Sequence, residues 1–158
     1  MDLKEAILEK INNKTAVVGV IGLGYVGLPL SVEKAKAGYK TIGFDVQHKK
    51  VKAVNEGLNY IGDVVDADLD KVVKSGMLTA TSDFSFIKNV DCVAICVPTP
   101  LDVYQQPDIS YVKSSAESIA EFLHAGMLIV LESTTYPGTT EELLLTVFEK
   151  TSGVKCGK

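Results

Sequence analysis

The chain has 158 residues, of which 46% are hydrophobic and 23% charged, and its formal net charge is −4 at pH 7. This composition is that of one globular domain with a single buried core, and it excludes a disordered chain and a bare disulfide scaffold. The lysines are scattered and form no basic stripe, which argues against binding to nucleic acid or to an anionic membrane surface. Any bound phosphate must therefore be held by backbone N–H groups.

Residues 1–13 are expected to form a helical extension, because Leu3, Ile7 and Ile11 fall on one face of a helix. The charges in this segment exclude a secretory signal, and no apolar run in the chain approaches the length of a membrane-spanning helix. We therefore expect a cytoplasmic protein.

Short continuous apolar runs rich in β-branched residues predict strands that are buried on both faces. Four such strands are predicted, at residues 16–22, 40–45, 91–97 and 127–133. Helical patterns lie between and after them, at residues 25–37, 47–55, 68–74, 110–123 and 139–150. Repeated alternation of strand and helix predicts an α/β fold with a doubly wound parallel sheet.

The stretch VIGLGYVGLPL follows the first predicted strand and opens the next helix. Gly22 would allow the tight turn out of the strand, Gly24 would let the backbone approach a pyrophosphate, and Gly27 would let the helix pack against the strand. The N–H groups of Tyr25 and Val26, at the positive end of the helix dipole, would then face the phosphates. A P-loop is excluded, because leucine and not lysine follows the third glycine.

Asp45 ends the second predicted strand, roughly 20 residues beyond the glycines, where a dinucleotide-binding fold has a carboxylate. Such a carboxylate accepts hydrogen bonds from the adenosine ribose hydroxyls and repels the extra phosphate of NADP, so the predicted cofactor is NAD. The alternative interpretation is that Asp45 caps the helix that follows it.

Five motifs occur in a characteristic order: GLGYVGLPLS, GFDV, CVPTPL, PDISYV and ESTTYPGTT. Together they resemble the UDP-glucose/GDP-mannose dehydrogenase family, and within it the bacterial branch that oxidises UDP-N-acetylmannosamine or UDP-N-acetylglucosamine to uronic acids for surface polysaccharides. The resemblance implies that residues 14–158 are a Rossmann-type NAD-binding domain. It also implies a single domain cut from a longer two-domain enzyme, with the substrate domain absent.

The resemblance assigns a role to matching positions. The glycine turn matches the pyrophosphate site, and Lys50 falls where the family has a basic residue near the adenosine, although an exposed lysine is ordinary. Val97, Pro98 and Thr99 match a loop that passes the cofactor, where Pro98 would also stiffen the strand exit. Thr134 matches a cofactor-site threonine whose hydroxyl helps to hold an active-site water. Its alternative role is a hydroxyl of a turn or helix cap.

The remaining chemistry of the sequence is sparse. Cys92 and Cys96 lie on a predicted core strand, where a thiol packs as a small hydrophobic group, and Cys156 lies near the end. No CxxC pair or Cys/His spacing occurs, which predicts reduced thiols and no metal site. Glu132 is not expected to be the catalytic base, because the acidic partner of the threonine in the family belongs to a segment that this sequence does not reach.

The expected function is therefore that of the NAD-binding domain of a nucleotide-sugar 6-dehydrogenase. The resemblance implies oxidation of the C6 alcohol of a UDP-N-acetylhexosamine or UDP-hexose with two NAD, a UDP-sugar as partner of the intact enzyme, a homodimer, and no activity of this fragment alone. Two alternatives stay open: the NAD-binding domain of a β-hydroxyacid-type dehydrogenase, and a cofactor-binding module without chemistry. The motifs CVPTPL and PDISYV favour the first interpretation.

Overall fold

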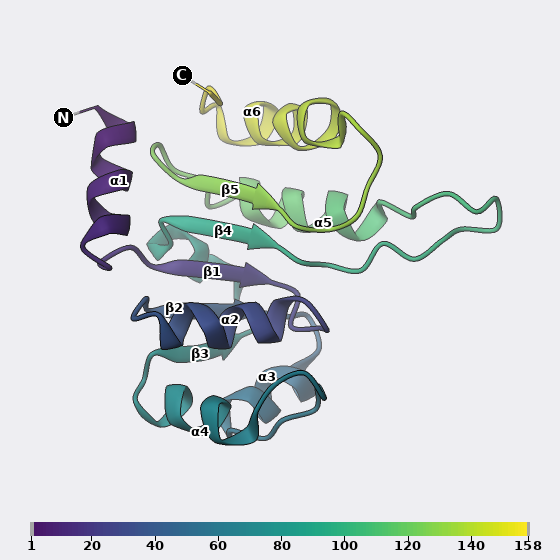
Figure 1. Cartoon of the computed structure of the whole chain (residues 1–158). Coiled ribbons are helices and arrows are strands. Elements are labelled where there is room, and N and C mark those ends of the chain that lie inside the picture. The colour runs from purple at the N-terminus through teal and green to yellow at the C-terminus, as the bar shows by residue number, and fades with distance from the viewer. Residues whose placement is uncertain (1, 158) are drawn as a thin grey trace.

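A sheet of five parallel strands forms the centre of the computed structural model, which describes residues 2–157. The strands lie in the order β3-β2-β1-β4-β5 (Figure 1). They are β1 (Val18–Ile21), β2 (Thr41–Phe44), β3 (Leu78–Thr81), β4 (Cys92–Ile95) and β5 (Leu128–Leu131). The predicted Rossmann-type parallel sheet is thus confirmed.

Helices cover both faces of the sheet (Figure 1). The helices of the described chain are α1 (Leu3–Asn12), α2 (Gly27–Lys36), α3 (His48–Asn55), α4 (Asp66–Lys74), α5 (Ser110–Ala120) and α6 (Thr146–Ser152), with the 3₁₀ helix η1 (Phe84–Asn89) and the π-helical η2 (Thr140–Leu145). The helices α2, α3 and α4 pack over β1, β2 and β3, and α5 and η1 pack on the opposite face with η2 and α6. This arrangement follows from right-handed crossovers, which place helices on opposite faces when the strand order reverses.

The central strand β1 shows why the predicted strands are apolar throughout. All four of its residues are buried, because successive side chains point to opposite faces and both faces are covered. Val20 packs on the side of α2, and Ile21 packs with Phe44 and the residues of α5.

The strand β3 is not among the four strands predicted from apolar runs. It lies at the edge of the sheet, and Leu78 and Ala80 are buried whereas Thr79 is exposed. Its sequence LTAT therefore alternates and lacks the continuous apolar run by which doubly covered strands are recognised.

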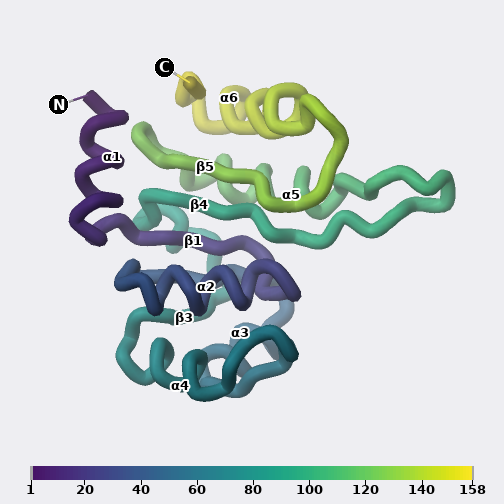
Figure 2. The backbone as a smooth tube through the Cα atoms, viewed as in Figure 1, coloured from purple at the N-terminus to yellow at the C-terminus, as the bar shows by residue number. Residues whose placement is uncertain are grey.

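The strands β1 and β4 are neighbours, yet the chain leaves them toward opposite faces of the sheet. A crevice opens at such a point between the carboxyl ends of the two strands, and ligands of open α/β sheets bind there. The segment after β4 also projects beyond the sheet as an arm, closed by a bridge between Leu101 and Pro107 (Figure 2).

The N-terminal helix α1 is anchored at the opposite end of the strands. The Lys10 ammonium lies 2.6 Å from a carboxylate oxygen of Asp91, and the Tyr39 hydroxyl donates a 2.9 Å hydrogen bond to the carbonyl of Ile11. Both ends of the described chain lie on this side of the molecule (Figure 2). Among residues 2–157, no helix is long and apolar enough to cross a membrane.

Candidate functional site

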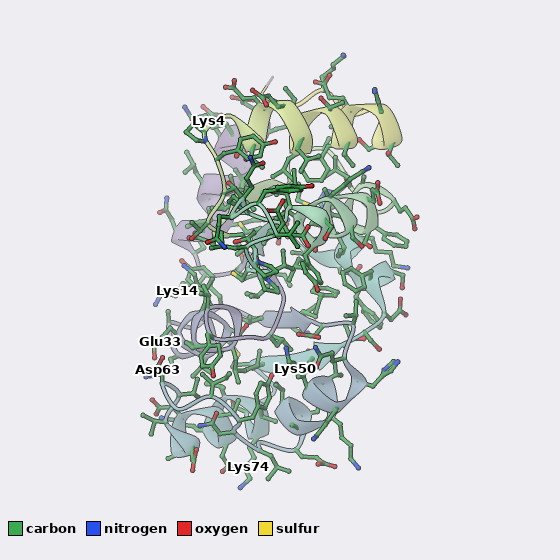
Figure 3. All side chains as sticks on the ribbon, turned by 90° about the vertical axis from the view of Figure 1, so that its right-hand side faces the viewer. Lys4, Lys14, Glu33, Lys50, Asp63 and Lys74 are labelled. Carbon is green, nitrogen blue, oxygen red and sulfur yellow. The ribbon has the colours of Figure 1, made fainter. Side chains whose placement is uncertain are left out.

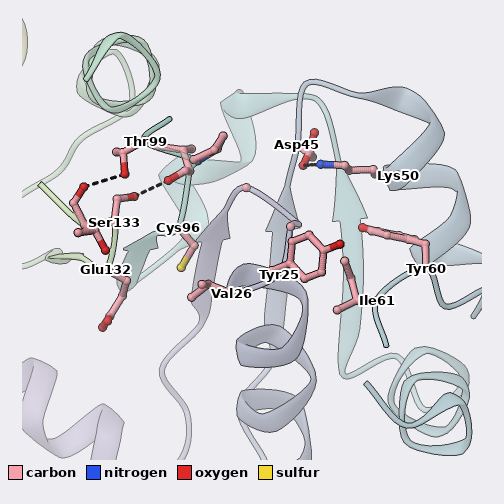
Figure 4. Close-up of a pocket in the computed structure, with 15 residues that line it drawn as sticks. Tyr25, Val26, Asp45, Lys50, Tyr60, Ile61, Cys96, Thr99, Glu132 and Ser133 are labelled. Carbon is pink, nitrogen blue, oxygen red and sulfur yellow. Dashed lines mark hydrogen bonds and ion pairs between the residues drawn. The ribbon is translucent and has the colours of Figure 1, made fainter. Parts of the chain in front are cut away.

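A cavity of about 430 Å³ lies at the carboxyl ends of the strands. It is lined by residues that come from five separate segments of the chain: Gly22, Gly24, Tyr25, Val26, Asp45, Lys50, Tyr60, Ile61, Cys96, Val97, Pro98, Thr99, Glu132, Ser133 and Thr134 (Figure 4). Every residue assigned from sequence is among them except Gly27, which is buried behind the turn. The tertiary structure therefore brings the candidate residues to one place.

The three glycines of the turn meet three different steric conditions. Gly22 has a φ of +92°, which side-chain-bearing residues rarely adopt, and a Cβ on Gly27 would lie only 1.7 Å from the carbonyl oxygen of Gly22. A Cβ on Gly24 would meet nothing within 4 Å. The first and third glycines are therefore required by the fold, whereas the second leaves open space at the cavity wall.

The amino end of α2 carries N–H groups without partners. This end of α2 has no side-chain cap, and within residues 2–157 we find no hydrogen bond donated by the N–H groups of Tyr25 or Val26. The first N–H groups of a helix and the positive end of its dipole together form a site for an anion. Tyr25 and Val26 line the cavity, so the anion would lie within it.

The Asp45 carboxylate faces the same cavity from the end of β2. Its side chain is almost wholly buried, and its two oxygens accept 2.9 Å hydrogen bonds from the N–H groups of Leu23 and Gln47. The hydrogen bond from the N–H of Gln47, the residue before α3, agrees in part with the helix-capping interpretation. The hydrogen bond from the N–H of Leu23 joins the carboxylate to the glycine turn. The Lys50 ammonium lies 3.5 Å from the carboxylate (Figure 4), so it is paired at the cavity wall.

Lys50 is distinguished from the other lysines by its place. Figure 3 looks onto the carboxyl ends of the strands, with Lys50 near them and Lys4, Lys14 and Lys74 toward the outline of the molecule. The Lys50 side chain is 29% exposed, whereas that of Lys74 is 75% exposed. Lys50 therefore differs from an ordinary solvated lysine on the surface.

The loops after β4 and β5 are joined by two hydroxyl groups (Figure 4). Ser133 donates a 2.7 Å hydrogen bond to the carbonyl of Val97, and Thr99 donates one of 2.7 Å to the carbonyl of Thr134. Within the described chain, the Thr134 hydroxyl itself has no hydrogen-bond partner. The Val97–Thr99 loop and Thr134 thus form one wall of the cavity, with a free hydroxyl on it.

Cys96 and Glu132 line the cavity beside this wall. Burial, and secondarily the carboxylate of Glu132, raise the pKa of the Cys96 thiol to about 12. The thiol is therefore protonated at neutral pH and is not a nucleophile. This agrees with the interpretation of Cys96 as a core residue.

Tyr60 and Ile61 are cavity residues that the sequence patterns do not reveal. They lie between α3 and α4, a segment with no recognisable motif, and Ile61 is buried while Tyr60 is partly exposed. No signal along the chain marks them, because their position depends on how α3 and α4 pack against the sheet. Among residues 2–157, no cluster of three or more His, Cys, Asp or Glu side chains could hold a metal ion.

The residues present fit a dinucleotide. The free N–H groups and the open space at Gly24 suit a pyrophosphate, and the Asp45 carboxylate suits ribose hydroxyls. The remaining wall includes Val97, Pro98, Thr99 and Thr134. Thr99 and Ser133 lie across the turn from Asp45 (Figure 4), where the other half of such a molecule would extend.

Comparison with known proteins gives a consistent result. Residues 16–157 match the family described as "UDP-glucose/GDP-mannose dehydrogenase family, NAD binding domain". The chain is 35% identical over 141 residues to the UDP-N-acetyl-D-mannosamine dehydrogenase of Pyrococcus horikoshii, covering 89% of this chain and 33% of that protein. It is 34% identical over 142 residues to the UDP-N-acetyl-D-glucosamine 6-dehydrogenase of Pseudomonas aeruginosa, covering 90% and 33%.

A solved structure extends the likeness to the fold. The crystal structure of NDP-N-acetyl-D-galactosaminuronic acid dehydrogenase from Methanosarcina mazei Go1 has a TM-score of 0.86 and 33% sequence identity, and the match covers 99% of this chain and 35% of that one. The chain therefore spans about a third of the length of these relatives.

Proposed function

This chain belongs to the UDP-glucose/GDP-mannose dehydrogenase family, as its NAD-binding domain, and on that premise we propose how it binds NAD and what the whole enzyme oxidises. The proposed enzyme converts the C6 primary alcohol of a UDP-N-acetylhexosamine, or of a UDP-hexose, into a carboxylate. The change removes four electrons and therefore consumes two NAD and one water. The names of the relatives favour the N-acetylated sugars.

One observation carries the assignment of the cofactor site. A single cavity gathers the glycine turn after β1, the carboxylate at the end of β2, and the loops after β4 and β5. We assign the pyrophosphate to the N–H groups of Tyr25 and Val26, with Gly22, Gly24 and Gly27 shaping the turn. The adenosine ribose is assigned to Asp45, and Lys50 lies beside it.

The nicotinamide half is assigned to the other wall of the cavity, formed by Val97, Pro98, Thr99 and Thr134. Bound NAD supplies a hydride acceptor there. The Thr134 hydroxyl, free within the described residues, is proposed to hold a water molecule in place for the chemistry. The residues that capture and release the oxidised sugar are proposed to lie outside this chain, so this chain alone is expected to be inactive.

The remaining assignments concern the whole protein. Residues 1–13 are proposed to be a helical extension, and residues 14–158 the cofactor domain, to which a separate domain contributes the UDP-sugar site. We propose that the intact enzyme is a homodimer that works in the cytoplasm.

Calorimetric titration of this chain with NAD and, separately, with NADP tests the cofactor assignment. NAD is expected to bind more tightly than NADP, and Asp45→Ala is expected to weaken NAD binding about tenfold or more, because two ribose acceptors are lost. Asp83→Ala is the matched control, since Asp83 also accepts a backbone hydrogen bond, at 2.9 Å from Ser85, but lies outside the cavity. Equal loss in the two variants, or tighter binding of NADP, would overturn the assignment.

A further inference from the structure

Tyr60 is a cavity residue to which neither a sequence motif nor the proposed function assigns a role. Its hydroxyl donates a 2.8 Å hydrogen bond to the carbonyl oxygen of Leu23, the residue between the first two glycines of the turn. Tyr60 is 37% exposed as a residue and forms part of the cavity wall. Tyr60 therefore reaches from the segment between α3 and α4 to the turn after β1.

Leu23 is held at three points. Its N–H donates to Asp45, its carbonyl accepts from Tyr60, and its side chain is fully buried against Gly43, where a Cβ would come within 2.6 Å of it. The peptide groups on both sides of Leu23 are thus fixed by side chains from distant parts of the chain. The flanking residues, Gly22 and Gly24, are the ones with the greatest backbone freedom.

The bond from Tyr60 fixes the peptide unit that joins Leu23 to Gly24. A trans peptide is planar, so its C=O and N–H point in opposite directions, and holding the Leu23 carbonyl also fixes the Gly24 N–H. Among residues 2–157, we find no hydrogen bond donated by the N–H of Gly24, as for Tyr25 and Val26. These successive N–H groups are the ones that would meet a phosphate.

We propose that Tyr60 is a positioning residue for the cofactor pyrophosphate: its hydroxyl holds the Leu23–Gly24 peptide so that the free N–H groups of the turn are oriented before the cofactor arrives. This inference rests on the proposed NAD site. If the glycine turn is already ordered before binding, the free energy of cofactor binding does not have to include the entropic cost of ordering it. Burial, and the nearby Asp45 carboxylate, raise the pKa of Tyr60, so the hydroxyl keeps its proton at neutral pH.

The test removes the hydroxyl alone, with Tyr60→Phe, and compares it with Tyr39→Phe. Tyr39 donates an equivalent bond, 2.9 Å long, to the carbonyl of Ile11, far from the cavity. Affinities for NAD, ADP-ribose and adenosine are measured by calorimetry or NMR titration. Tyr60→Phe is expected to weaken NAD and ADP-ribose about three- to tenfold, the value of one ordinary hydrogen bond, and to leave adenosine, which has no pyrophosphate, unchanged. Tyr39→Phe is expected to leave all three unchanged.

Each other outcome overturns the inference in a distinguishable way. Equal weakening of adenosine would mean that Tyr60 contacts the adenosine directly, and equal effects of the two variants would mean a loss of general stability. If the wild-type chain and Tyr60→Phe bind NAD equally well, the proposed role of Tyr60 is wrong but the proposed NAD site stands. If the wild-type chain binds neither NAD nor ADP-ribose, the proposed cofactor site falls with it. The amide ¹⁵N shift of Gly24 gives a second readout: it is expected to change in ligand-free Tyr60→Phe and not in Tyr39→Phe.

Discussion

The backbone N–H of Leu23 donates a 2.9 Å hydrogen bond to the Asp45 carboxylate, and so joins the turn after β1 to the end of β2. A carboxylate that is proposed to bind a ribose thus also holds the turn that is proposed to bind the pyrophosphate. The two halves of the cofactor site are therefore coupled through one side chain, and loss of the Asp45 carboxylate is expected to affect both.

Gly24→Ala and Gly27→Ala separate binding from folding. A methyl group on Gly24 projects into open space, so Gly24→Ala is expected to fold with an unchanged thermal midpoint and to weaken NAD at least about tenfold by blocking the approach of the phosphate. A methyl group on Gly27 would lie 1.7 Å from the carbonyl oxygen of Gly22, and destabilisation by about 3 kcal/mol or more is expected. Thermal melts and NAD titrations of both variants test this. Loss of stability in Gly24→Ala would contradict the open space at that position.

Lys50→Ala is expected to weaken NAD two- to fivefold, an order-of-magnitude value for one partly exposed charge. The reason is that Lys50 lies 3.5 Å from Asp45 at the cavity wall. Lys52→Ala is the matched control on the same helix, because the Lys52 side chain is 75% exposed and lies 3.8 Å from Glu56. Titrations at low and high salt measure the difference. If both variants bind NAD like the wild type, Lys50 is only a surface charge.

Thr134→Ala is expected to leave NAD binding by this chain nearly unchanged and to slow the whole enzyme about a hundredfold, a typical cost of misplacing a group that takes part in proton transfer. Thr135→Ala serves as the control, since Thr135 is its neighbour but does not line the cavity. Steady-state rates with a UDP-sugar and NAD decide between them. An unaltered rate in Thr134→Ala would remove the assigned role.

Asp91 makes the anchoring of α1 dependent on pH. Burial alone would raise the pKa of its carboxyl, but hydrogen bonds from Lys10 and the N–H of Val17 outweigh it, and the pKa is lower than in the unfolded chain. The stabilisation is therefore present above about pH 4, near the unfolded pKa of an aspartate, and is lost as the pH falls through the folded value.

Asp91→Asn is accordingly expected to lower the free energy of unfolding by about 1–2 kcal/mol at pH 7, with a smaller difference from the wild type at pH 3. Urea unfolding at several pH values measures it. Asp70→Asn, in an exposed pair with Lys74 at 2.8 Å, is expected to change stability by less than about 1 kcal/mol. A difference for Asp91→Asn that is constant with pH would contradict this account.

The three thiols are expected to react with iodoacetamide slowly and in order of exposure. The pKa of Cys96 is raised to about 12 by burial and Glu132, and burial also raises the pKa values of Cys92 and Cys156. At pH 8, Cys156 should label first and Cys96 last, with fast labelling of all three in urea. Mass spectrometry of timed samples reads the order. Rapid labelling of Cys96 in the folded chain would show that its thiol is accessible and ionised.

Local patterns determined most of the fold. The apolar runs at β1, β2, β4 and β5 predict strands, because a strand covered on both faces needs apolar side chains at consecutive positions. The glycine turn and Asp45 could also be predicted from sequence, because the steric and hydrogen-bonding requirements of a βαβ unit fall at fixed spacings along the chain. The resemblance to a family then identified the Val97–Thr99 loop and Thr134 as candidate site residues.

Only the tertiary structure decided the remainder. β3 is an edge strand whose alternating residues match no buried run, and its pairing with β2 gives its place and register in the sheet. Tyr60 reaches Leu23 across 37 positions of sequence, and Ser133 reaches Val97 across 36. Such contacts depend on where helices and loops pack, and no local pattern encodes that, because the partners are brought together only when the whole sheet and its covering layers are formed.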